Sequence, residues 1–185
     1  MDSKRVAAAV RELLAAIGEN PDREALSATP EKVAQAYAEF FRGVGQDPLA
    51  PLSEGMTSDQ RDPVILRDIE LVSICEHHLL PFTGVAHIAY LPSGKIVGLG
   101  RLAQVVEVLA ARPQLQENLT NQIADALETG LAPRGVFVML EARHQCVASR
   151  GARQPEVNTM TLAARGELAE PAARSEIIAL LAVKP

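Results

Sequence analysis

The order of apolar periodicities along the chain is the feature that most restricts its fold. Two runs rich in branched residues, over residues 64–74 and 83–91, are typical of strands. Helical spacing then appears over residues 101–131, in two pieces that a proline divides. A long strand over residues 136–148 and a weaker one over 157–164 follow. Two helices inserted between two pairs of strands predict an α+β fold with an antiparallel sheet.

Two amphipathic helices are predicted before these strands. Residues 4–17 carry apolar side chains at helical spacing, and Gly18 follows as a C-terminal stop. The second helix is predicted to begin at Thr29 and Pro30, with Thr29 as its cap and Pro30 in its first turn. The sequence therefore predicts a helical N-terminal extension of the α+β fold.

The segment after this extension is predicted to be a linker. Residues 43–62 are rich in Gly, Pro, Ser and Asp, which favour turns and loops. We therefore divide the chain into an N-terminal helical region with its linker, residues 1–60, and a second domain, residues 61–185. A last helix is expected over residues 172–183.

Charge and aromatic content argue against a nucleic-acid-binding protein. The net charge is −5, aromatic residues make up 3% of the chain, and Trp is absent. Nucleic-acid binders usually carry a basic face, and those that bind single strands add stacking aromatic side chains. A small anionic ligand is compatible with this composition, because a few local cations suffice to hold it.

The sequence shows no membrane or secretion signal. No apolar run approaches the roughly 20 residues that span a bilayer, and the N-terminus alternates charged with apolar residues. We therefore expect a cytoplasmic protein. Cysteines stay reduced in the cytoplasm, so Cys75 and Cys146 are better interpreted as a metal site, a nucleophile or plain core than as a disulfide.

Both cysteines and three of the four histidines fall into two short segments. Cys75, His77 and His78 lie where a predicted strand ends. His144 and Cys146 lie in the predicted long strand, where alternation would point both side chains toward one face. The two segments can therefore supply one site with two thiolates and up to three imidazoles.

This donor set suits a catalytic zinc ion. Two thiolates and one imidazole are a known ligand set that leaves the fourth position for water, whose pKa the ion lowers to about 7. The remaining imidazoles would suit general acid and base catalysis. The alternatives are plain core cysteines and a structural zinc site, which more often shows paired CxxC or HxxxH spacings that this chain lacks. The clustering favours a hydrolytic metal site.

Three segments resemble GTP cyclohydrolase I in the family's order and spacing: CEHHLLPFTG, IVGLGRLAQVVEVLAARPQLQENLT and EARHQCVASRG. The resemblance covers about residues 25–166. It implies the tunnelling fold, in which sheets of several subunits close into a barrel and two pentamers stack into a homodecamer with active sites between subunits. It also implies hydrolytic opening of the guanine imidazole ring of GTP, with release of formate and formation of 7,8-dihydroneopterin triphosphate for pterin and tetrahydrofolate biosynthesis.

The resemblance assigns individual residues in three groups. The ligands of a Zn2+ ion would be Cys75, His78 and Cys146. The catalytic histidines would be His77 and His144, of which His144 would protonate N7 of guanine. The residues assigned to substrate binding are Glu76, Gln116, Glu117, Arg101, Arg150 and, from a neighbouring subunit, Lys32. In this last group, the Gln-Glu pair would hold guanine and the basic residues would hold the triphosphate.

Two positions depart from the family's pattern. Gly100 and Gln104 stand where the family often has a serine and an arginine, so one hydroxyl and one guanidinium are missing. Triphosphate binding is therefore expected to be weaker, because an amide makes no charge-assisted bond to phosphate. The alternatives to the hydrolase are a catalytically silent or regulatory zinc-binding homologue and a nitrile reductase of queuosine synthesis. His87, inside a predicted strand, is interpreted as structural.

Overall fold

The structure is a computed structural model, and it describes residues 1–183. Contacts within the chain group it into two compact units, one of residues 1–42 and one that begins at Gly43. This grouping joins residues 43–60 to the second unit, and the division into functional domains at residue 60 stays a prediction. Within the described residues, no helix combines the length and the apolar character needed to cross a membrane.

The first unit consists of the two predicted helices, α1 (Ser3–Ala16) and α2 (Thr29–Phe40). The side chain of Asp2 caps α1 by accepting a hydrogen bond from the backbone of Arg5 at 3.1 Å. Pro30 lies in the first turn of α2, as predicted, but Thr29 is not its cap. The N-cap is Ala28, whose backbone is already helical and which has no side chain to accept a bond, so the prediction for Thr29 was wrong.

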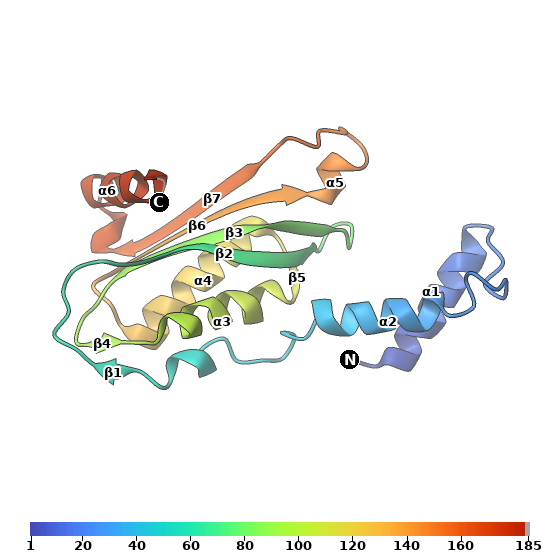
Figure 1. The fold of residues 1–185 in the computed structure, drawn as a ribbon, viewed down its shortest axis with the longest axis horizontal. Coiled ribbons are helices and arrows are strands. Elements are labelled where there is room, and N and C mark those ends of the chain that lie inside the picture. The colour runs from blue at the N-terminus through green and yellow to red at the C-terminus, as the bar shows by residue number, and fades with distance from the viewer. Residues whose placement is uncertain (184–185) are drawn as a thin grey trace. The chain divides into compact units, whose positions relative to one another are not determined.

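The second unit is an α+β fold built on one large sheet (Figure 1). Its elements, in chain order, are η1 (Ala50–Leu52), β1 (Met56–Thr57), β2 (Val64–Cys75), β3 (Pro81–Leu91), β4 (Lys95–Ile96), α3 (Leu99–Ala110), β5 (Pro113–Gln114), α4 (Gln116–Leu131), β6 (Gly135–His144), α5 (Gln145–Ala148), β7 (Thr159–Gly166), η2 (Glu167–Ala169) and α6 (Pro171–Ala182). The two helices α3 and α4 stand between the pairs β2–β3 and β6–β7, which confirms the predicted fold class.

The strand order in the large sheet is β5-β2-β3-β6-β7. The long strands pair antiparallel, and only the two-residue β5 runs parallel to its neighbour β2. In the central pair, Phe82 of β3 lies opposite His144 of β6, and Gly84 lies opposite Ala142. β3 and β6 each have a neighbouring strand on both sides, and β6 carries His144 at its last position, where it pairs with β3 alone.

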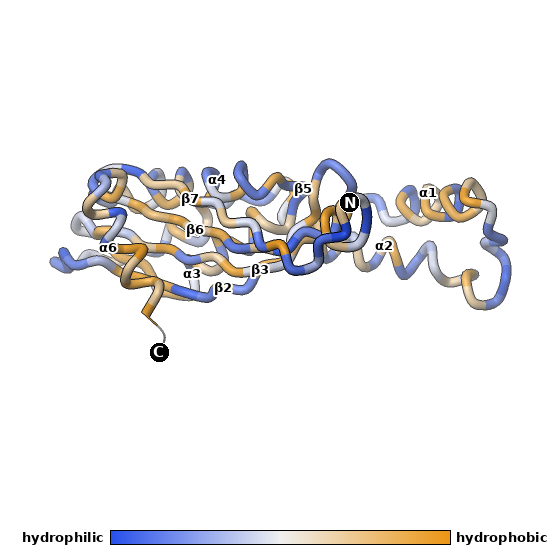
Figure 2. The backbone as a smooth tube through the Cα atoms, turned by 90° about the horizontal axis from the view of Figure 1, so that it is seen from above, coloured by the Kyte–Doolittle hydropathy of each residue, from blue (hydrophilic) through white to orange (hydrophobic). Residues whose placement is uncertain are grey.

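The core lies between the sheet and the helices α3 and α4. Both middle strands are buried along most of their length, and Figure 2 shows them as largely hydrophobic. Ile88 and Tyr90 of β3 point into the main core with Leu102 of α3 and Leu119 of α4. Alternate residues of β3 reach the opposite face, where they form a smaller cluster with Ile177 of α6. The helices α3 and α4 thus cover one face of the sheet, and α6 covers only part of the other, where Met160 and Leu162 of β7 remain exposed.

The segment predicted to be a linker is partly structured. It contains η1 and β1, and Leu52 of η1 is only 1% exposed because it packs into the main core. The ammonium group of Lys95 donates to the backbone oxygens of Leu52 and Gly130, at 3.1 and 2.9 Å. The turn-rich composition concealed a short element that is anchored to the core by Leu52 and, beside it, by the partly buried Leu49.

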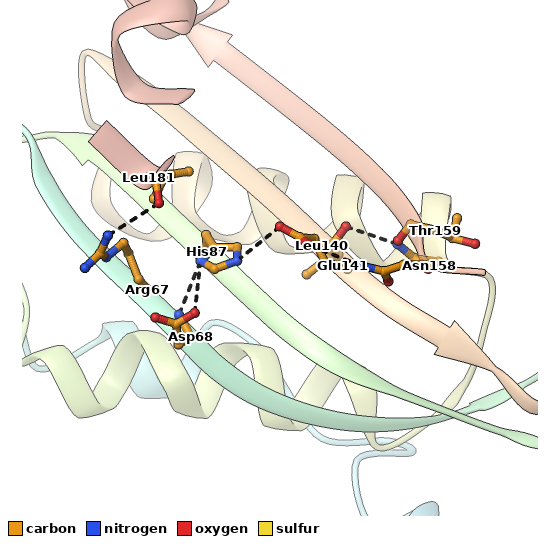
Figure 3. Close-up of polar contacts among 9 residues, drawn as sticks. Arg67, Asp68, His87, Leu140, Glu141, Asn158, Thr159 and Leu181 are labelled. Carbon is orange, nitrogen blue, oxygen red and sulfur yellow. Dashed lines mark hydrogen bonds and ion pairs between the residues drawn. The ribbon is translucent and has the colours of Figure 1, made fainter. Parts of the chain in front are cut away.

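His87 lies on the sheet face opposite α3 and α4, and its side chain is buried (Figure 3). Its Nδ1 atom accepts a hydrogen bond from the backbone of Asp68 at 3.3 Å, at a bulge in β2 where Asp68 has a φ of 58°. Its Nε2 atom lies 3.8 Å from a carboxylate oxygen of Glu141. These contacts fit a structural histidine that holds the bulged strand to its neighbours.

Gly84 is required by the close pairing of β3 and β6, which gives a testable prediction. A Cβ atom at this position would lie 1.9 Å from the backbone oxygen of Glu141 and 2.6 Å from the Cα of Ala142. Because both contacts are backbone atoms, Gly84→Ala is expected to lower the free energy of unfolding by about 3 kcal/mol. Chemical denaturation measures this loss.

Gly100→Ala serves as the matched control for this prediction. A Cβ atom at Gly100 in α3 meets nothing within 4 Å, and the residue lies in a helix. The control is therefore expected to raise the free energy of unfolding by up to about 1 kcal/mol. Equal stability of the two alanine variants would show that β3 and β6 are not as close as the structure has them.

Candidate metal centre and active site

Three potential metal ligands converge at one end of the large sheet. Cys75 ends β2, His78 lies in the turn between β2 and β3, and Cys146 lies in α5. One ligand atom from each lies within 4.8 Å of the other two. Because zinc ligands lie about 2.0–2.3 Å from the ion, donor atoms this close can share one ion.

The turn after β2 is held by backbone hydrogen bonds. The N–H of Leu79 donates to the oxygen of Cys75, and the N–H of Cys75 donates to the oxygen of Leu80, both at 2.9 Å. Leu79 has a positive φ of 52°, which reverses the chain over a short distance. The turn therefore places His78 beside the cysteine that precedes it by three positions.

Cys146 reaches the site in a different way from the one predicted. The long strand was expected to continue through residue 148, so that His144 and Cys146 would share a face by alternation. Instead, β6 ends at His144 and the chain forms the helical turn α5. The prediction that Cys146 lies in a strand was therefore wrong, although the side chains of His144 and Cys146 line the same cavity.

The thiols of Cys75 and Cys146 lie together in a partly desolvated environment. Cys75 is 5% exposed, and Cys146 is half-buried against the main core. Burial raises the pKa of the Cys146 thiol, the neighbouring Cys75 raises it further, and Arg150 opposes the shift. Two adjacent thiols resist losing both protons unless a cation is present to bind the thiolates. A soft divalent cation such as zinc fits this donor set, because thiolate and imidazole ligands select it.

A cavity of about 360 Å³ adjoins these ligands. Its volume falls in the range of about 300–1,000 Å³ that is usual for small-molecule sites. The residues that line it are Cys75, His77, Gln114, Leu115, Gln116, Glu117, His144, Cys146, Val147 and Thr159. The cavity thus joins the metal ligands to two imidazoles and one carboxylate, which is the set that hydrolysis with acid and base assistance requires.

His144 is the most firmly held imidazole of the site. Its ring stacks on Phe82, with ring centroids 4.5 Å apart and an interplanar angle of 16°. Its Nε2 atom lies 2.7 Å from the amide oxygen of Gln116. Burial lowers the pKa of His144, and the nearby carboxylate of Glu117 partly opposes this shift. The ring is therefore fixed in position at the cavity wall.

The residues predicted for guanine binding differ in their placement. Glu117 is exposed in the first turn of α4 and lines the cavity. Gln116 lines the same cavity, but its side chain is 1% exposed. Glu76 is exposed, and its backbone N–H donates to the oxygen of Gln114 at 3.1 Å. Of these predicted residues, Glu117 offers the most accessible carboxylate in the cavity.

The residues that line the cavity include none of the basic residues predicted for the triphosphate. Arg101 forms an ion pair with Glu54, and it donates to the amide oxygen of Gln104 at 3.3 Å. Arg150 is exposed after α5, close enough to Cys146 to affect its pKa. Lys32 is exposed on α2, in the first unit. The cavity within one chain thus holds the groups for ring chemistry without these cations among its lining residues.

Sequence reasoning missed three residues that shape the site. Phe82 is fully buried beneath the ring of His144, and Gln114 and Thr159 line the cavity. Gln114 could have been noticed from its place two residues before Gln116, and Phe82 from its place in the segment CEHHLLPFTG, which carries part of the family resemblance. Thr159 gave no signal, because only the pairing of β6 with β7 brings it near.

Comparison with known proteins assigns the chain to a family. The family model described as GTP cyclohydrolase I matches residues 6–182. The chain belongs to the GTP cyclohydrolase I family. The matched range includes all of the metal ligands and all of the lining residues of the cavity. The resemblance read from three sequence segments is therefore confirmed for nearly the whole chain.

Individual GTP cyclohydrolases agree with this assignment. The protein named GTP cyclohydrolase 1 in Leifsonia xyli subsp. xyli is 59% identical over 97% of this chain and 95% of its own length. The GTP cyclohydrolase 1 proteins of Streptomyces griseus and Carboxydothermus hydrogenoformans are each 51% identical, over 97% and 98% of this chain and 90% and 95% of their own lengths. The matches therefore extend over at least 90% of each protein.

One solved structure shows a remote similarity to this chain. The apo form of a protein titled archaeosine synthase QueF-Like is 15% identical, with a TM-score of 0.44 over 59% of this chain and 96% of its own. A likeness this weak carries no argument about activity. The assignment to the GTP cyclohydrolase I family depends on the sequence matches alone.

Proposed function

We propose that this chain is a GTP cyclohydrolase I, which opens the imidazole ring of the guanine of GTP by hydrolysis, releases formate and forms 7,8-dihydroneopterin triphosphate. The observation that carries the proposal is the group of Cys75, His78 and Cys146, with ligand atoms within 4.8 Å, beside a cavity that also holds His77 and His144. Full-length similarity to proteins named GTP cyclohydrolase 1 supports the choice of substrate.

Cys75, His78 and Cys146 would hold a zinc ion, and the remaining imidazoles would stay free. When bound, zinc supplies the Lewis acidity that makes water a nucleophile near neutral pH. His144 would donate a proton to N7 of guanine as the ring opens, because it is held rigidly at the cavity wall. His77 also lines the cavity and would act as a second acid or base.

Glu117 would select guanine among the nucleobases. Its carboxylate can accept the N1 and N2 hydrogens of guanine, which adenine does not present in that pattern. Its position in the first turn of α4, at the cavity wall, supports this role. Glu76 neighbours the metal ligands, and we assign it to substrate binding with Glu117.

The triphosphate would be bound at an interface between subunits. We propose that Arg101 and Arg150 of one chain and Lys32 of a neighbouring chain contact it in a homodecamer of two pentamers, with the sheets closed into barrels. Arg101 already carries an ion pair with Glu54 and a hydrogen bond to Gln104, so phosphate must displace the carboxylate. Gln104 can orient the Arg101 guanidinium even though it adds no positive charge of its own. The protein would act in the cytoplasm, in pterin and tetrahydrofolate biosynthesis.

Incubation of the zinc-loaded protein with GTP tests this function. We expect formate and, after oxidation, a fluorescent pterin in equal amounts, because ring opening and reclosure follow one another. Protein treated with a chelator should release neither product, since the nucleophile depends on the metal. Zinc without formate release would favour a catalytically silent or regulatory homologue. Oxidation of a reduced nicotinamide in the presence of a nitrile substrate would favour the nitrile reductase.

A further inference from the structure

Gln116, the first residue of α4, has a side chain that the protein surrounds completely. Only 1% of it is exposed, although it lies at the wall of the cavity. Its amide nitrogen lies 2.9 Å from the backbone oxygen of Thr159, 3.2 Å from that of Leu140 and 3.1 Å from the hydroxyl of Thr161. Three acceptors therefore share the two hydrogens of one amide group.

These acceptors fix the orientation of the Gln116 amide. A backbone oxygen can only accept, so the group that faces Thr159 and Leu140 must be the NH2 group. The reverse orientation would bring three oxygens together in a buried place, where unpaired polar atoms are costly. The amide oxygen of Gln116 must then face the ring of His144.

The fixed amide determines which nitrogen of His144 carries hydrogen. The distance between the Gln116 oxygen and Nε2 of His144 is 2.7 Å, and an amide oxygen has no hydrogen to donate. Nε2 must therefore be the donor. Stacking on Phe82 holds the ring in the plane that this bond requires. Among the described residues, Nδ1 of His144 has no hydrogen-bond partner, so this nitrogen remains available.

We propose that Gln116 is a positioning residue, which holds the hydrogen of the neutral His144 ring on Nε2 and leaves Nδ1 as the nitrogen that first takes up a proton from water and then donates it to the substrate. This role differs from the side-chain contact with guanine that the family resemblance implies for Gln116. It depends on the proposed function only for the identity of the substrate. The hydrogen bonds that set the tautomer are present without any ligand.

The tautomer can be measured directly on the zinc-loaded protein. With histidines labelled in the ring with 15N, solid-state NMR of the sedimented wild-type protein distinguishes a protonated from an unprotonated ring nitrogen. The His144 signals are assigned by their absence from His144→Ala. We expect Nε2 to be protonated and Nδ1 not to be, in the absence of GTP. A neutral His144 with its hydrogen on Nδ1 would overturn the proposal, and this result does not depend on whether GTP is the substrate.

A variant of Gln116 separates positioning from substrate binding. Gln116→Met keeps the side-chain length and removes the acceptor for His144. We expect kcat for ring opening to fall at least about 10-fold with little change in KM, since a general acid in a wrong tautomer loses its proton path. The Nε2–H signature should also be lost or mixed. A rise in KM with kcat and the NMR signature unchanged would show that the Gln116 side chain binds guanine instead.

Thr161→Val is the matched control for this variant. It removes one acceptor of the Gln116 amide but leaves both backbone oxygens, which suffice to fix the amide. We therefore expect Thr161→Val to keep the Nε2–H tautomer. Loss of the tautomer in Thr161→Val would contradict the argument from the backbone oxygens. If Gln116→Met does not fold, the wild-type and Thr161→Val spectra still test the proposal.

Discussion

His144→Ala is expected to keep its zinc and to lose ring opening of GTP by a factor of about 100 or more. The residue is not among the three ligand candidates, so the metal should remain. Its imidazole is the best-held acid beside the metal centre, fixed by Phe82 and Gln116. Without it, the guanine nitrogen would have to be protonated by His77 or by water. Metal analysis and formate release, measured on the same preparation, check both halves of the prediction.

The effect of His144→Ala on stability has to be separated from its effect on catalysis. The substitution leaves the amide oxygen of Gln116 without its partner and removes the ring that covers Phe82, which should cost about 1–3 kcal/mol. Assays should therefore be run well below the melting temperature of the variant. Arg143→Ala is a suitable control, because Arg143 precedes His144 in the same strand, is exposed, and lies 3.5 Å from Glu156 in a surface ion pair. Near-normal formate release from folded His144→Ala would refute the role of this residue.

Cys146→Ser is expected to lose both the metal and the activity. A serine hydroxyl does not ionise near neutral pH and is a poor zinc ligand, so the metal content should fall from about one ion per chain to well below that. Formate release should fall with it, because the nucleophile depends on the metal. Cys146 is half-buried, and serine is close to it in size, so the fold should survive.

Cys75→Ser extends this test to the other thiol. Cys75 is buried, so the hydroxyl is less well tolerated there, and the melting temperature has to be recorded with the metal content. Ser149→Ala controls for general effects near α5, because the Ser149 hydroxyl only donates to the backbone oxygen of Gln145. Full zinc retention in either cysteine variant would contradict the assignment of the ligands.

Much of the fold could be predicted because apolar periodicity and branched residues coincide with the elements that form. The strands β2 and β3 and the division of the helical stretch at Pro113 follow from such local signals. Local sequence signals failed to predict the structure of segments whose conformation is determined by tertiary contacts. Leu52 lies in a turn-rich segment, but its burial in the core and the hydrogen bond from Lys95 to its backbone oxygen give the segment a fixed structure. The C-terminal part of the predicted long strand becomes the turn α5 despite its strand-like composition.

The convergence of Cys75, His78 and Cys146 could be predicted because chemically distinctive residues were concentrated in two segments, and their role as metal ligands stays a prediction. The manner of their convergence could not, since it depends on where β6 stops. The hydrogen bonds of Gln116 were also beyond the reach of sequence reasoning. They involve backbone oxygens of two different strands, and a backbone oxygen has no sequence signature. It stays a prediction that the triphosphate is bound by Arg101, Arg150 and Lys32.

The pairing of β3 with β6 has a consequence for the order of events during synthesis of the chain. Cys75 and His78 leave the ribosome long before Cys146, and only the middle strands bring the two segments together. Early in translation, the first two donors can hold a metal ion only loosely. High-affinity binding of a metal ion by all three residues would therefore follow alignment of the central strands, and the ion would stabilise a sheet that is already formed.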